Sequence, residues 1–286
     1  MPKTIVITGG TNGIGLAAAE ALAAHGETVV IVGRSHTRTR AAAARVGAVA
    51  EKGAIVDTLV ADLSSRAGVR RLAQDIRDRY PALDVLVNNA GAMYTRRQLT
   101  EDGIELTWAV NHLAPFLLTT LLLDRLQAAP GARVVTTASD AHIGAQIPFD
   151  DLNAERGYRG FRRYKESKLA NILFTKELAR RLQGSGTAAY CFHPGLVATG
   201  INRNNGILMS VATALLMSVA RRPEQGAQTL VWLATAPDRD LVSGAYYVDM
   251  EIRPPSAGAQ DMTAARRLWE VSEAQCARRV PEAPAV

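Results

Sequence analysis

The stretch Tyr164-Lys165-Glu166-Ser167-Lys168 carries the residues best suited to chemistry. Tyr164 and Lys168 are four positions apart on a predicted helix, so their side chains share one face. A phenol has an ordinary pKa of about 10, and a nearby ammonium lowers that pKa toward neutrality. We therefore interpret Tyr164 as a general acid for a carbonyl oxygen, or a general base for an alcohol. A solvated pair is the alternative, because this spacing is common by chance, but its place after five predicted parallel strands favours the catalytic interpretation.

A glycine-rich turn near the N-terminus is the second candidate site. The β-branched run 4–7 predicts a buried strand, and the run 14–25 predicts a helix. Between them, glycines let the backbone come close to a ligand, and the positive end of the helix dipole favours an anion. The spacing Gly9-x-x-x-Gly13-x-Gly15 differs from the common G-x-G-x-x-G fingerprint. A cofactor phosphate is our interpretation, and an ordinary strand-to-helix turn is the alternative.

The end of the second predicted strand indicates which dinucleotide fits. A carboxylate there would bind a ribose 2′-hydroxyl, whereas an arginine accommodates a 2′-phosphate. This chain has Arg34 and Ser35 with no acid nearby, and Thr11 or Ser35 could add a hydroxyl. We therefore predict NADP(H) rather than NAD(H), with a solvated surface arginine as the alternative. Asp62 could accept a bond from the adenine amino group, or it could cap a helix.

Strands and helices alternate along the chain, which predicts an α/β fold with a doubly wound parallel sheet of about seven strands and helices on both faces. We expect one domain over 1–280 and a flexible tail over 281–286. Ligands of such sheets bind beyond the carboxyl ends of the strands. The predicted strands lie near 4–7, 28–32, 56–61, 85–87, 133–137, 188–192 and 245–248, and the predicted helices near 14–25, 36–51, 66–79, 103–128, 164–183 and 224–235.

Composition narrows the function classes. The net charge is +6, but the arginines are scattered, which disfavours a nucleic-acid surface. Cys191 and Cys276 are far apart and form no CxxC, so we predict no metal site and a reducing compartment. The N-terminus resembles no signal peptide, and the apolar stretch 207–220 is too short to span a bilayer. These features lead us to expect a cytoplasmic protein without a membrane span.

Taken together and in this order, the glycine turn, Asn88-Asn89-Ala90-Gly91, Ser139 and the Tyr164/Lys168 pair resemble the short-chain dehydrogenase/reductase family over nearly the whole chain. Three further stretches resemble its retinol dehydrogenase-like branch, which includes the WW-domain oxidoreductase and protochlorophyllide reductase relatives. They are Val110-Asn111-His112-Leu113-Ala114-Pro115-Phe116, Ser167-Lys168-Leu169-Ala170-Asn171 and His193-Pro194-Gly195. The long gap from Ser139 to Tyr164, with Asp151-Leu152-Asn153 inside it, also matches that branch.

The resemblance implies a role for each matching residue. Tyr164 exchanges a proton with the substrate oxygen, Lys168 binds the nicotinamide ribose, Ser139 hydrogen-bonds the substrate oxygen, and Asn111 holds a water in a proton relay. Thr199 reaches the nicotinamide carboxamide. The full set of expected cofactor-binding residues is Gly9, Thr11, Asn12, Gly13, Ile14, Gly15, Arg34, Ser35, Asp62, Leu63, Asn89, Ala90, Gly91, Tyr164, Lys168, Pro194, Gly195, Val197 and Thr199.

Asn111 also has a physical argument of its own. Pro115 follows four residues later and has no N–H to donate, so a helix through both residues loses a hydrogen bond at the Asn111 carbonyl and kinks. A carbonyl freed in this way can bind a water. Two departures from the family pattern lie next to Ser139: Ala138 replaces a frequent serine, and Asp140 places a carboxylate where it could alter substrate preference.

The substrate is a carbonyl or alcohol on this interpretation. A Gly/Asn-rich hinge near 200–206 precedes the mostly apolar run 207–217, which predicts a mobile lid over a small or lipophilic substrate such as a retinal-like aldehyde, ketone or quinone. A core helix or an oligomer contact is the alternative for 207–220, and a homodimer or homotetramer is compatible with the sequence. The competing function is a non-catalytic NADP(H)-binding regulatory or scaffold protein, which the complete set Asn111, Ser139, Tyr164 and Lys168 disfavours.

Overall fold

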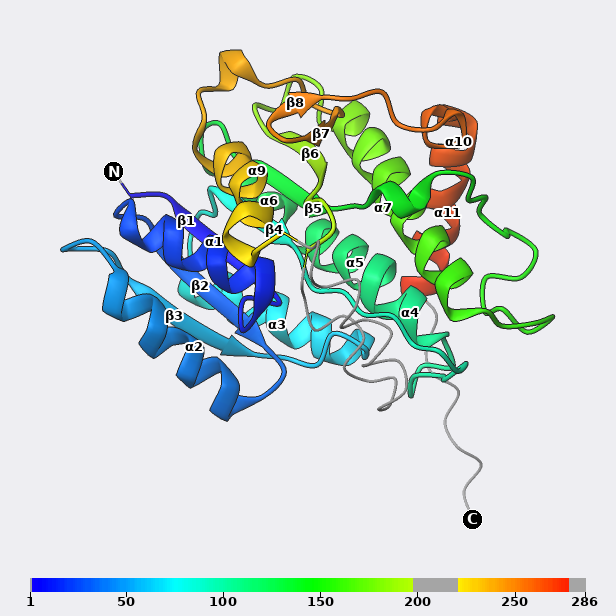
Figure 1. The fold of residues 1–286 in the computed structure, drawn as a ribbon, viewed down its shortest axis with the longest axis horizontal. Coiled ribbons are helices and arrows are strands. Elements are labelled where there is room, and N and C mark those ends of the chain that lie inside the picture. The colour runs from blue at the N-terminus through cyan, green and yellow to red at the C-terminus, as the bar shows by residue number, and fades with distance from the viewer. Residues whose placement is uncertain (1, 198–220, 278–286) are drawn as a thin grey trace.

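The structure is a computed structural model that describes residues 2–197 and 221–277. Its centre is an eight-stranded sheet in the order β3-β2-β1-β4-β5-β6-β7-β8, parallel except for the last strand, which runs antiparallel to β7 (Figure 1). The strands are β1 (Thr4–Thr8), β2 (Thr28–Gly33), β3 (Val56–Val60), β4 (Val85–Asn88), β5 (Arg133–Thr137), β6 (Ala188–His193), β7 (Tyr246–Val248) and β8 (Glu251–Ile252). This confirms the predicted fold class.

Helices cover both faces of this sheet. The described helices are α1 (Gly13–Ala24), α2 (His36–Val49), α3 (Arg66–Arg79), α4 (Leu106–Trp108), α5 (Ala114–Leu121), α6 (Leu123–Gln127), α7 (Gly160–Arg181), α9 (Pro223–Thr235), α10 (Ala257–Gln260) and α11 (Met262–Ala277). One core lies between the sheet and α1, α2 and α9, and the other between the sheet and α3, α5, α7 and α11. Both faces of each central strand are therefore buried: Ile5 and Ile7 face one core, and Val6 faces the other.

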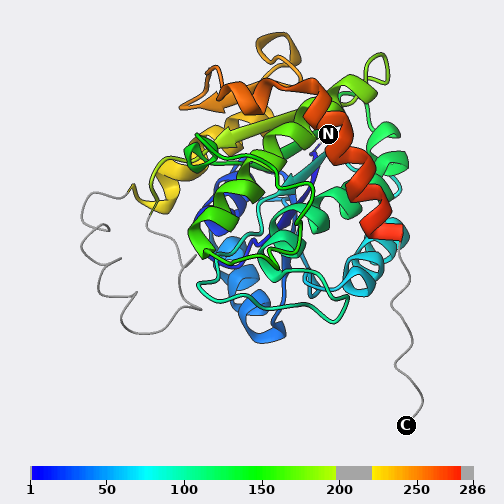
Figure 2. The ribbon, with the colours of Figure 1, turned by 90° about the vertical axis from the view of Figure 1, so that its right-hand side faces the viewer.

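The C-terminal helices were not predicted, and neither was β8. Helix α11 lies against the outer side of α7, as the turned view shows (Figure 2). Trp269 of α11 packs against Phe116 and Phe174, with ring centroids 4.8 Å and 6.0 Å away. Apolar burial of this kind orders a helix whose own sequence is a weak signal.

The predicted continuous helix over 103–128 is wrong. The structure divides this stretch into α4, a π-helical turn (Ala109–Leu113), α5 and α6. Within the π turn the Ala114 N–H bonds to the Ala109 carbonyl, five residues back. Pro115 has no N–H for the regular ladder, so the break predicted around Asn111 is present, in the form of a widened turn. Helix α7 likewise begins at Gly160 rather than at 164.

Candidate active site

A cavity of about 1030 Å³ lies at the carboxyl ends of the central strands, beside the point between β1 and β4 where the strand order reverses. Most of the predicted site residues line it. They are Gly9, Thr11, Asn12, Gly13, Ile14, Arg34, Ser35, Asp62, Leu63, Asn89, Ala90, Gly91, Ser139, Tyr164, Lys168, Pro194, Gly195 and Val197. Thr199 and the predicted lid over 207–217 lie outside the described residues, as does the predicted tail.

The glycine turn forms one wall of this cavity from backbone. Gly9 and Gly13 have φ values of +68° and +51°, which favour glycine. A Cβ on Gly9 would lie 2.9 Å from the Ala90 Cα, so the turn and the loop after β4 approach too closely for a side chain. Asn12 precedes α1 without a side-chain cap, which leaves the first N–H groups of the helix available to an anion. The residues present therefore fit a phosphate-bearing cofactor.

Gly15, which the sequence predicted as a cofactor-binding residue, does not line the cavity. It lies behind the cavity wall, where a Cβ would be 2.4 Å from the Gly9 carbonyl oxygen and 2.5 Å from the Asn89 Nδ2. Its hydrogen side chain thus permits close packing of helix on turn. Thr8 links the end of β1 to the loop after β4, because its hydroxyl accepts hydrogen bonds from the N–H groups of Asn89 and Ala90 at 3.0 Å and 3.2 Å.

The far end of the cavity carries positive charge. Arg34 is exposed and lines the wall together with Arg38, and no carboxylate in residues 2–197 or 221–277 forms an ion pair with Arg34. Burial raises the pKa of the neighbouring Tyr94 phenol, and the Arg34 guanidinium beside it acts in the opposite direction. Asp62 accepts bonds from the backbone N–H and hydroxyl of Ser64, whereas Ser65 caps α3. Asp62 is therefore not the cap of that helix.

Helix α7 brings Tyr164 and Lys168 to the opposite end. The Lys168 Nζ lies 5.5 Å from the centre of the Tyr164 ring and donates a 2.9 Å hydrogen bond to the Thr137 carbonyl at the end of β5. Burial lowers the pKa of Lys168 to about 8. Burial also raises the pKa of Tyr164 to about 12, which a hydrogen bond with the Ser139 side chain partly offsets.

The predicted lowering of the Tyr164 pKa by Lys168 is therefore wrong for the ligand-free protein. The ammonium lies over the face of the ring, so desolvation of the phenol outweighs any attraction between phenolate and ammonium. Tyr164 holds its proton at neutral pH in this state, and Lys168, with a pKa lowered to about 8, remains mostly charged.

Ser139 and Asn111 support this pair in different ways. The Ser139 Oγ accepts a 3.1 Å bond from the Ala141 N–H, which fixes the residue at the end of β5. Asn111 is fully buried behind the wall and does not line the cavity. Its side chain bonds to both the N–H and the carbonyl of Ala92, at 2.8 Å and 2.9 Å, and to the Ser167 hydroxyl at 3.0 Å. Asn111 thereby links the loop after β4 to α7.

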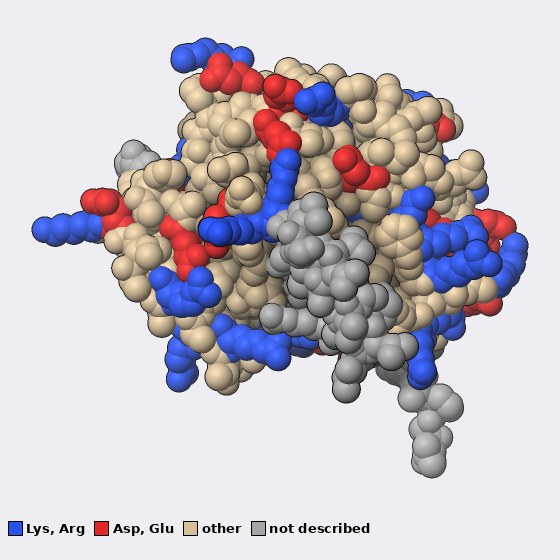
Figure 3. Space-filling model, viewed as in Figure 1, with Lys and Arg blue, Asp and Glu red and all other residues tan. Residues whose placement is uncertain are grey.

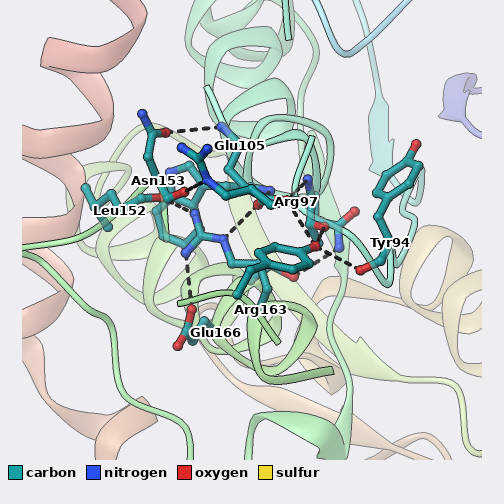
Figure 4. Close-up of polar contacts among 12 residues, drawn as sticks. Tyr94, Arg97, Glu105, Leu152, Asn153, Arg163 and Glu166 are labelled. Carbon is teal, nitrogen blue, oxygen red and sulfur yellow. Dashed lines mark hydrogen bonds and ion pairs between the residues drawn. The ribbon is translucent and has the colours of Figure 1, made fainter. Parts of the chain in front are cut away.

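The start of α7 is held by a buried group of charges (Figure 4). Arg163 and Glu105 are 1% and 0% exposed, and the Arg163 Nε lies 2.8 Å from the Glu105 carboxylate. Arg163 also contacts Glu166 and the Leu152 carbonyl. Glu105 caps α4 by accepting bonds from the N–H groups of Thr107 and Trp108, both 2.9 Å long. We call Glu105, Arg163 and Glu166 the buried charge cluster.

Residues 194–197 line the cavity, and Arg221 packs against them. Gly195 has a φ of +82°, and a Cβ there would lie 2.7 Å from the Arg221 Cδ. The Arg221 N–H donates a 2.7 Å bond to the Leu196 carbonyl, and its guanidinium pairs with Asp249. The chain on either side of 198–220 is thus joined at the cavity.

The model of the family described as short chain dehydrogenase matches residues 3–207, which is most of the chain. The chain belongs to the short-chain dehydrogenase family. Its members are oxidoreductases that use nicotinamide cofactors, and the cavity of this dehydrogenase fits such a group. The family resemblance inferred from the sequence motifs is confirmed.

Named relatives place this dehydrogenase in the retinol dehydrogenase-like branch. It is 43% identical over 275 residues to the Streptomyces sp. (strain C5) protein named "Putative daunorubicin C-13 ketoreductase DnrU", with 95% of this chain and 92% of that protein covered. It is 39% identical to human retinol dehydrogenase 13, covering 99% of this chain and 86% of that protein. A crystal structure of an uncharacterized Mycobacterium paratuberculosis protein matches with a TM-score of 0.78 and 32% identity, covering 98% of this chain and 97% of the other.

A second structural relative is a complex with NADP. The Pseudomonas aeruginosa RhlG/NADP active-site complex matches this dehydrogenase with a TM-score of 0.68 and 27% identity, covering 90% of this chain and 96% of that one.

Two further features of the structure concern membrane-spanning helices and the distribution of surface charge. None of the helices in the described part of the chain is both long and apolar enough to cross a membrane. On the face drawn in Figure 3, basic and acidic side chains are interspersed.

Sequence reasoning missed two kinds of residue in this dehydrogenase. Thr8, Glu105 and Arg163 position the site without a motif of their own, because their partners are far away in sequence. The apolar lining residues Met93, Leu106, Phe161 and Leu196 were also not singled out, and Val110 was named only within the stretch 110–116. Met93, Phe161 and Leu196 lie within three positions of the predicted site residues Gly91, Tyr164 and Pro194, and Leu106 lies in the predicted helix 103–128.

Proposed function

We propose that this chain is an NADP(H)-dependent reductase or dehydrogenase that acts on the carbonyl or alcohol carbon of a small or lipophilic substrate, with Tyr164 as the general acid or base. One observation carries the proposal. A single cavity has Tyr164, Ser139 and Lys168 at one end, and at the other an open helix N-terminus and Arg34, which pairs with no carboxylate in the described part of the chain.

The chain's own residues supply the proton and hold the oxygen. A bound nicotinamide would supply or accept the hydride. Burial raises the pKa of Tyr164 to about 12, so its phenol carries a proton at neutral pH and can donate it to a carbonyl oxygen. The Ser139 hydroxyl holds that oxygen beside the phenol. Lys168 holds ribose hydroxyls, and its charge opposes the negative charge that Tyr164 acquires after the transfer.

Arg34 supports a preference for NADP(H). Its guanidinium is exposed at the cofactor end with no acid paired to it in the described residues, and Arg38 lies on the same wall. A 2′-phosphate would gain charge-assisted hydrogen bonds there. The structural relative from Pseudomonas aeruginosa is a complex with NADP, which agrees with this assignment.

The apolar wall supports a lipophilic substrate. Met93, Leu106, Val110, Phe161 and Leu196 line the cavity, and Phe161 and Leu196 remain 62% and 55% exposed. Such surface favours ligands with apolar bodies. The names of the relatives, retinol dehydrogenases and a ketoreductase, point to the same substrate class.

Turnover with a panel of aldehydes, ketones and quinones tests the proposal. The purified protein is mixed with each compound and with NADPH or NADH, and the loss of reduced cofactor is followed by absorbance. We expect turnover of several lipophilic carbonyls, faster with NADPH. The matching alcohols with NADP⁺ test the reverse direction. Tight NADPH binding with no turnover of any carbonyl or alcohol would contradict the proposal and favour a non-catalytic binding protein.

A further inference from the structure

Asp140 is an acidic residue at the end of the cavity that carries Ser139 and Tyr164. It directly follows Ser139, and both residues line the same wall together with His193. Its side chain is 51% exposed. Its Cα is about 3.8 Å from the Ser139 Cα, and both residues line the cavity, so Asp140 is the acidic residue next to the predicted position of the substrate oxygen.

The position of the carboxylate is set by two residues from neighbouring strands. The Tyr246 hydroxyl of β7 donates a 2.6 Å hydrogen bond to Asp140 Oδ1. The His193 Nδ1 at the end of β6 accepts a 3.3 Å bond from the Asp140 N–H, so the ring proton is on Nε2, which lies 3.4 Å from Asp140 Oδ2. Each carboxylate oxygen has two acceptor positions, which leaves capacity for a further donor.

These two partners are neutral, so they do not cancel the charge of Asp140. Burial lowers the pKa of His193, and burial together with Asp140 raises the pKa of Tyr246. Arg221, the basic side chain near His193, is paired with Asp249. The other charged lining side chains in the described residues are Asp62, Arg34, Arg38 and Lys168. The first three are at the proposed cofactor end, and Lys168 donates to the Thr137 carbonyl and lies over the Tyr164 ring.

A further histidine makes the local backbone rigid. His142 donates from Nδ1 to the Ser139 carbonyl at 2.7 Å and accepts at Nε2 from the Ser256 N–H at 3.0 Å. Its ring packs edge-on against Tyr246, with centroids 5.3 Å apart. Ser139 and Asp140 are therefore held together as one unit beside Tyr164.

We propose that Asp140 selects carbonyl substrates that carry an ammonium or hydroxyl group beside the reacting carbon and disfavours substrates with a carboxylate there. This inference rests on the proposed function. A donor at that position gains a charge-assisted hydrogen bond to a half-exposed carboxylate on a residue that lines the cavity, whereas an anion meets repulsion at short range. The polar group adds to the apolar body that the rest of the wall accepts.

A series of ketones on one phenyl skeleton tests this selection. Acetophenone, 2-hydroxyacetophenone, protonated 2-aminoacetophenone and benzoylformate differ only beside the carbonyl. The kcat/KM of each is measured with NADPH in the unmodified protein and in Asp140→Asn, so that the intrinsic reactivity of each ketone cancels. We expect the substitution to lower the value for the ammonium ketone by at least about tenfold relative to acetophenone, and to raise the value for benzoylformate by a similar factor. The kcat/KM for the hydroxyketone should fall by about threefold relative to acetophenone.

Two other variants separate this effect from a general loss. Asp150→Asn removes the same charge from an exposed ion pair with Arg156 outside the cavity wall. For each of the four ketones, it should change kcat/KM relative to the unmodified protein by less than about twofold. Tyr246→Phe removes the donor that aims Oδ1, and should weaken the preference for the ammonium ketone by about threefold. A parallel change for all four ketones in Asp140→Asn would overturn the inference.

A binding measurement judges Asp140 without turnover. The Kd values of 2-amino-1-phenylethanol and 1-phenylethanol are measured calorimetrically on the protein with NADP⁺. We expect Asp140→Asn to raise the Kd of the aminoalcohol by about tenfold and the Kd of the plain alcohol by less than about twofold. Equal shifts would refute a role for Asp140. Absence of turnover of every carbonyl and alcohol tried would instead refute the proposed function, and these Kd values would still decide the question of Asp140.

Discussion

The two ends of the cavity are built on different principles. At the proposed cofactor end, backbone forms the wall: Gly9 and Gly13 adopt positive φ values, α1 presents uncapped N–H groups, and Arg34 forms no ion pair within residues 2–197 and 221–277. At the catalytic end, side chains form the wall, and the buried charge cluster of Glu105, Arg163 and Glu166 holds the start of α7.

This difference follows from what each end must do. A phosphate is bound by dipoles and N–H groups that come close, so small residues and free donors are needed. Proton transfer needs a phenol and a hydroxyl placed to within a few tenths of an ångström. Helix α7 is therefore tied to the loop after β4 by Asn111 and to α4 by Arg163, at a cost in buried charge that the cofactor end does not carry.

Removing the phenol hydroxyl should affect the catalytic end most strongly. We expect Tyr164→Phe to lower kcat by about 10²–10⁴-fold, because the general acid is lost, while the Kd for NADPH changes by less than about twofold. Steady-state kinetics and a fluorescence titration measure the two quantities. Tyr80→Phe, which removes a phenol hydroxyl bonded to Asp57 outside the cavity wall, is the matched control. Near-normal turnover in Tyr164→Phe would show that the proton comes from another group.

Breaking the buried charge cluster tests how much the cluster contributes to the stability of the fold around α7. Arg163→Met leaves the fully buried Glu105 carboxylate without its ion-pair partner, so the free energy of unfolding should fall by about 3–5 kcal/mol. Denaturant titration measures this. The neighbouring Arg162 is 69% exposed and pairs with Glu166 at 2.8 Å, so Arg162→Met should cost less than about 1 kcal/mol. Equal losses in the two variants would remove the contrast between the two ends.

The cofactor end can be tested through the 2′-phosphate. We expect NADPH to bind at least about tenfold tighter than NADH, equivalent to about 1.4 kcal/mol, and Arg34→Ala to erase most of that difference. Arg40→Ala changes an exposed arginine on α2 outside the cavity wall and should keep the preference. Equal Kd values for the two cofactors in the unmodified protein would exclude Arg34 as the selective residue.

A smaller effect should appear in the pH dependence of cofactor binding. Burial lowers the pKa of Lys168 to about 8, so the ammonium is lost as the pH rises through that value. Because the anionic cofactor favours the charged form, the Kd for NADPH should rise by about threefold to tenfold between about pH 7 and pH 9. The stability of the ligand-free protein has the opposite pH dependence. Because the pKa of Lys168 is lower in the folded state than in the unfolded state, the free energy of unfolding increases as the pH rises from about 8 toward 10.5. Lys168→Met should flatten both dependences, and a flat Kd profile in the unmodified protein would argue against contact with the cofactor.

The sequence by itself determined the order of the first seven strands and the residues at the carboxyl ends of those strands. Apolar periodicity and turn residues are local signals, and the parallel sheet then gathers every strand end at one edge. Glycine spacing, Arg34 and the Tyr164/Lys168 pair are therefore enough to predict one shared cavity, which they line in the structure. Even the break near Asn111 followed from Pro115 alone.

Only the tertiary structure decided how those residues are held and charged. Glu105 and Arg163 are 58 positions apart, Asp140 and Tyr246 are 106 apart, and nothing local marks either pair. The proton on Tyr164 was misjudged because i, i+4 spacing shows that two side chains share a helix face, but not that the ammonium lies over the ring. Ionisation depends on desolvation and on the distance between specific atoms, and both arise only when segments distant in sequence pack together.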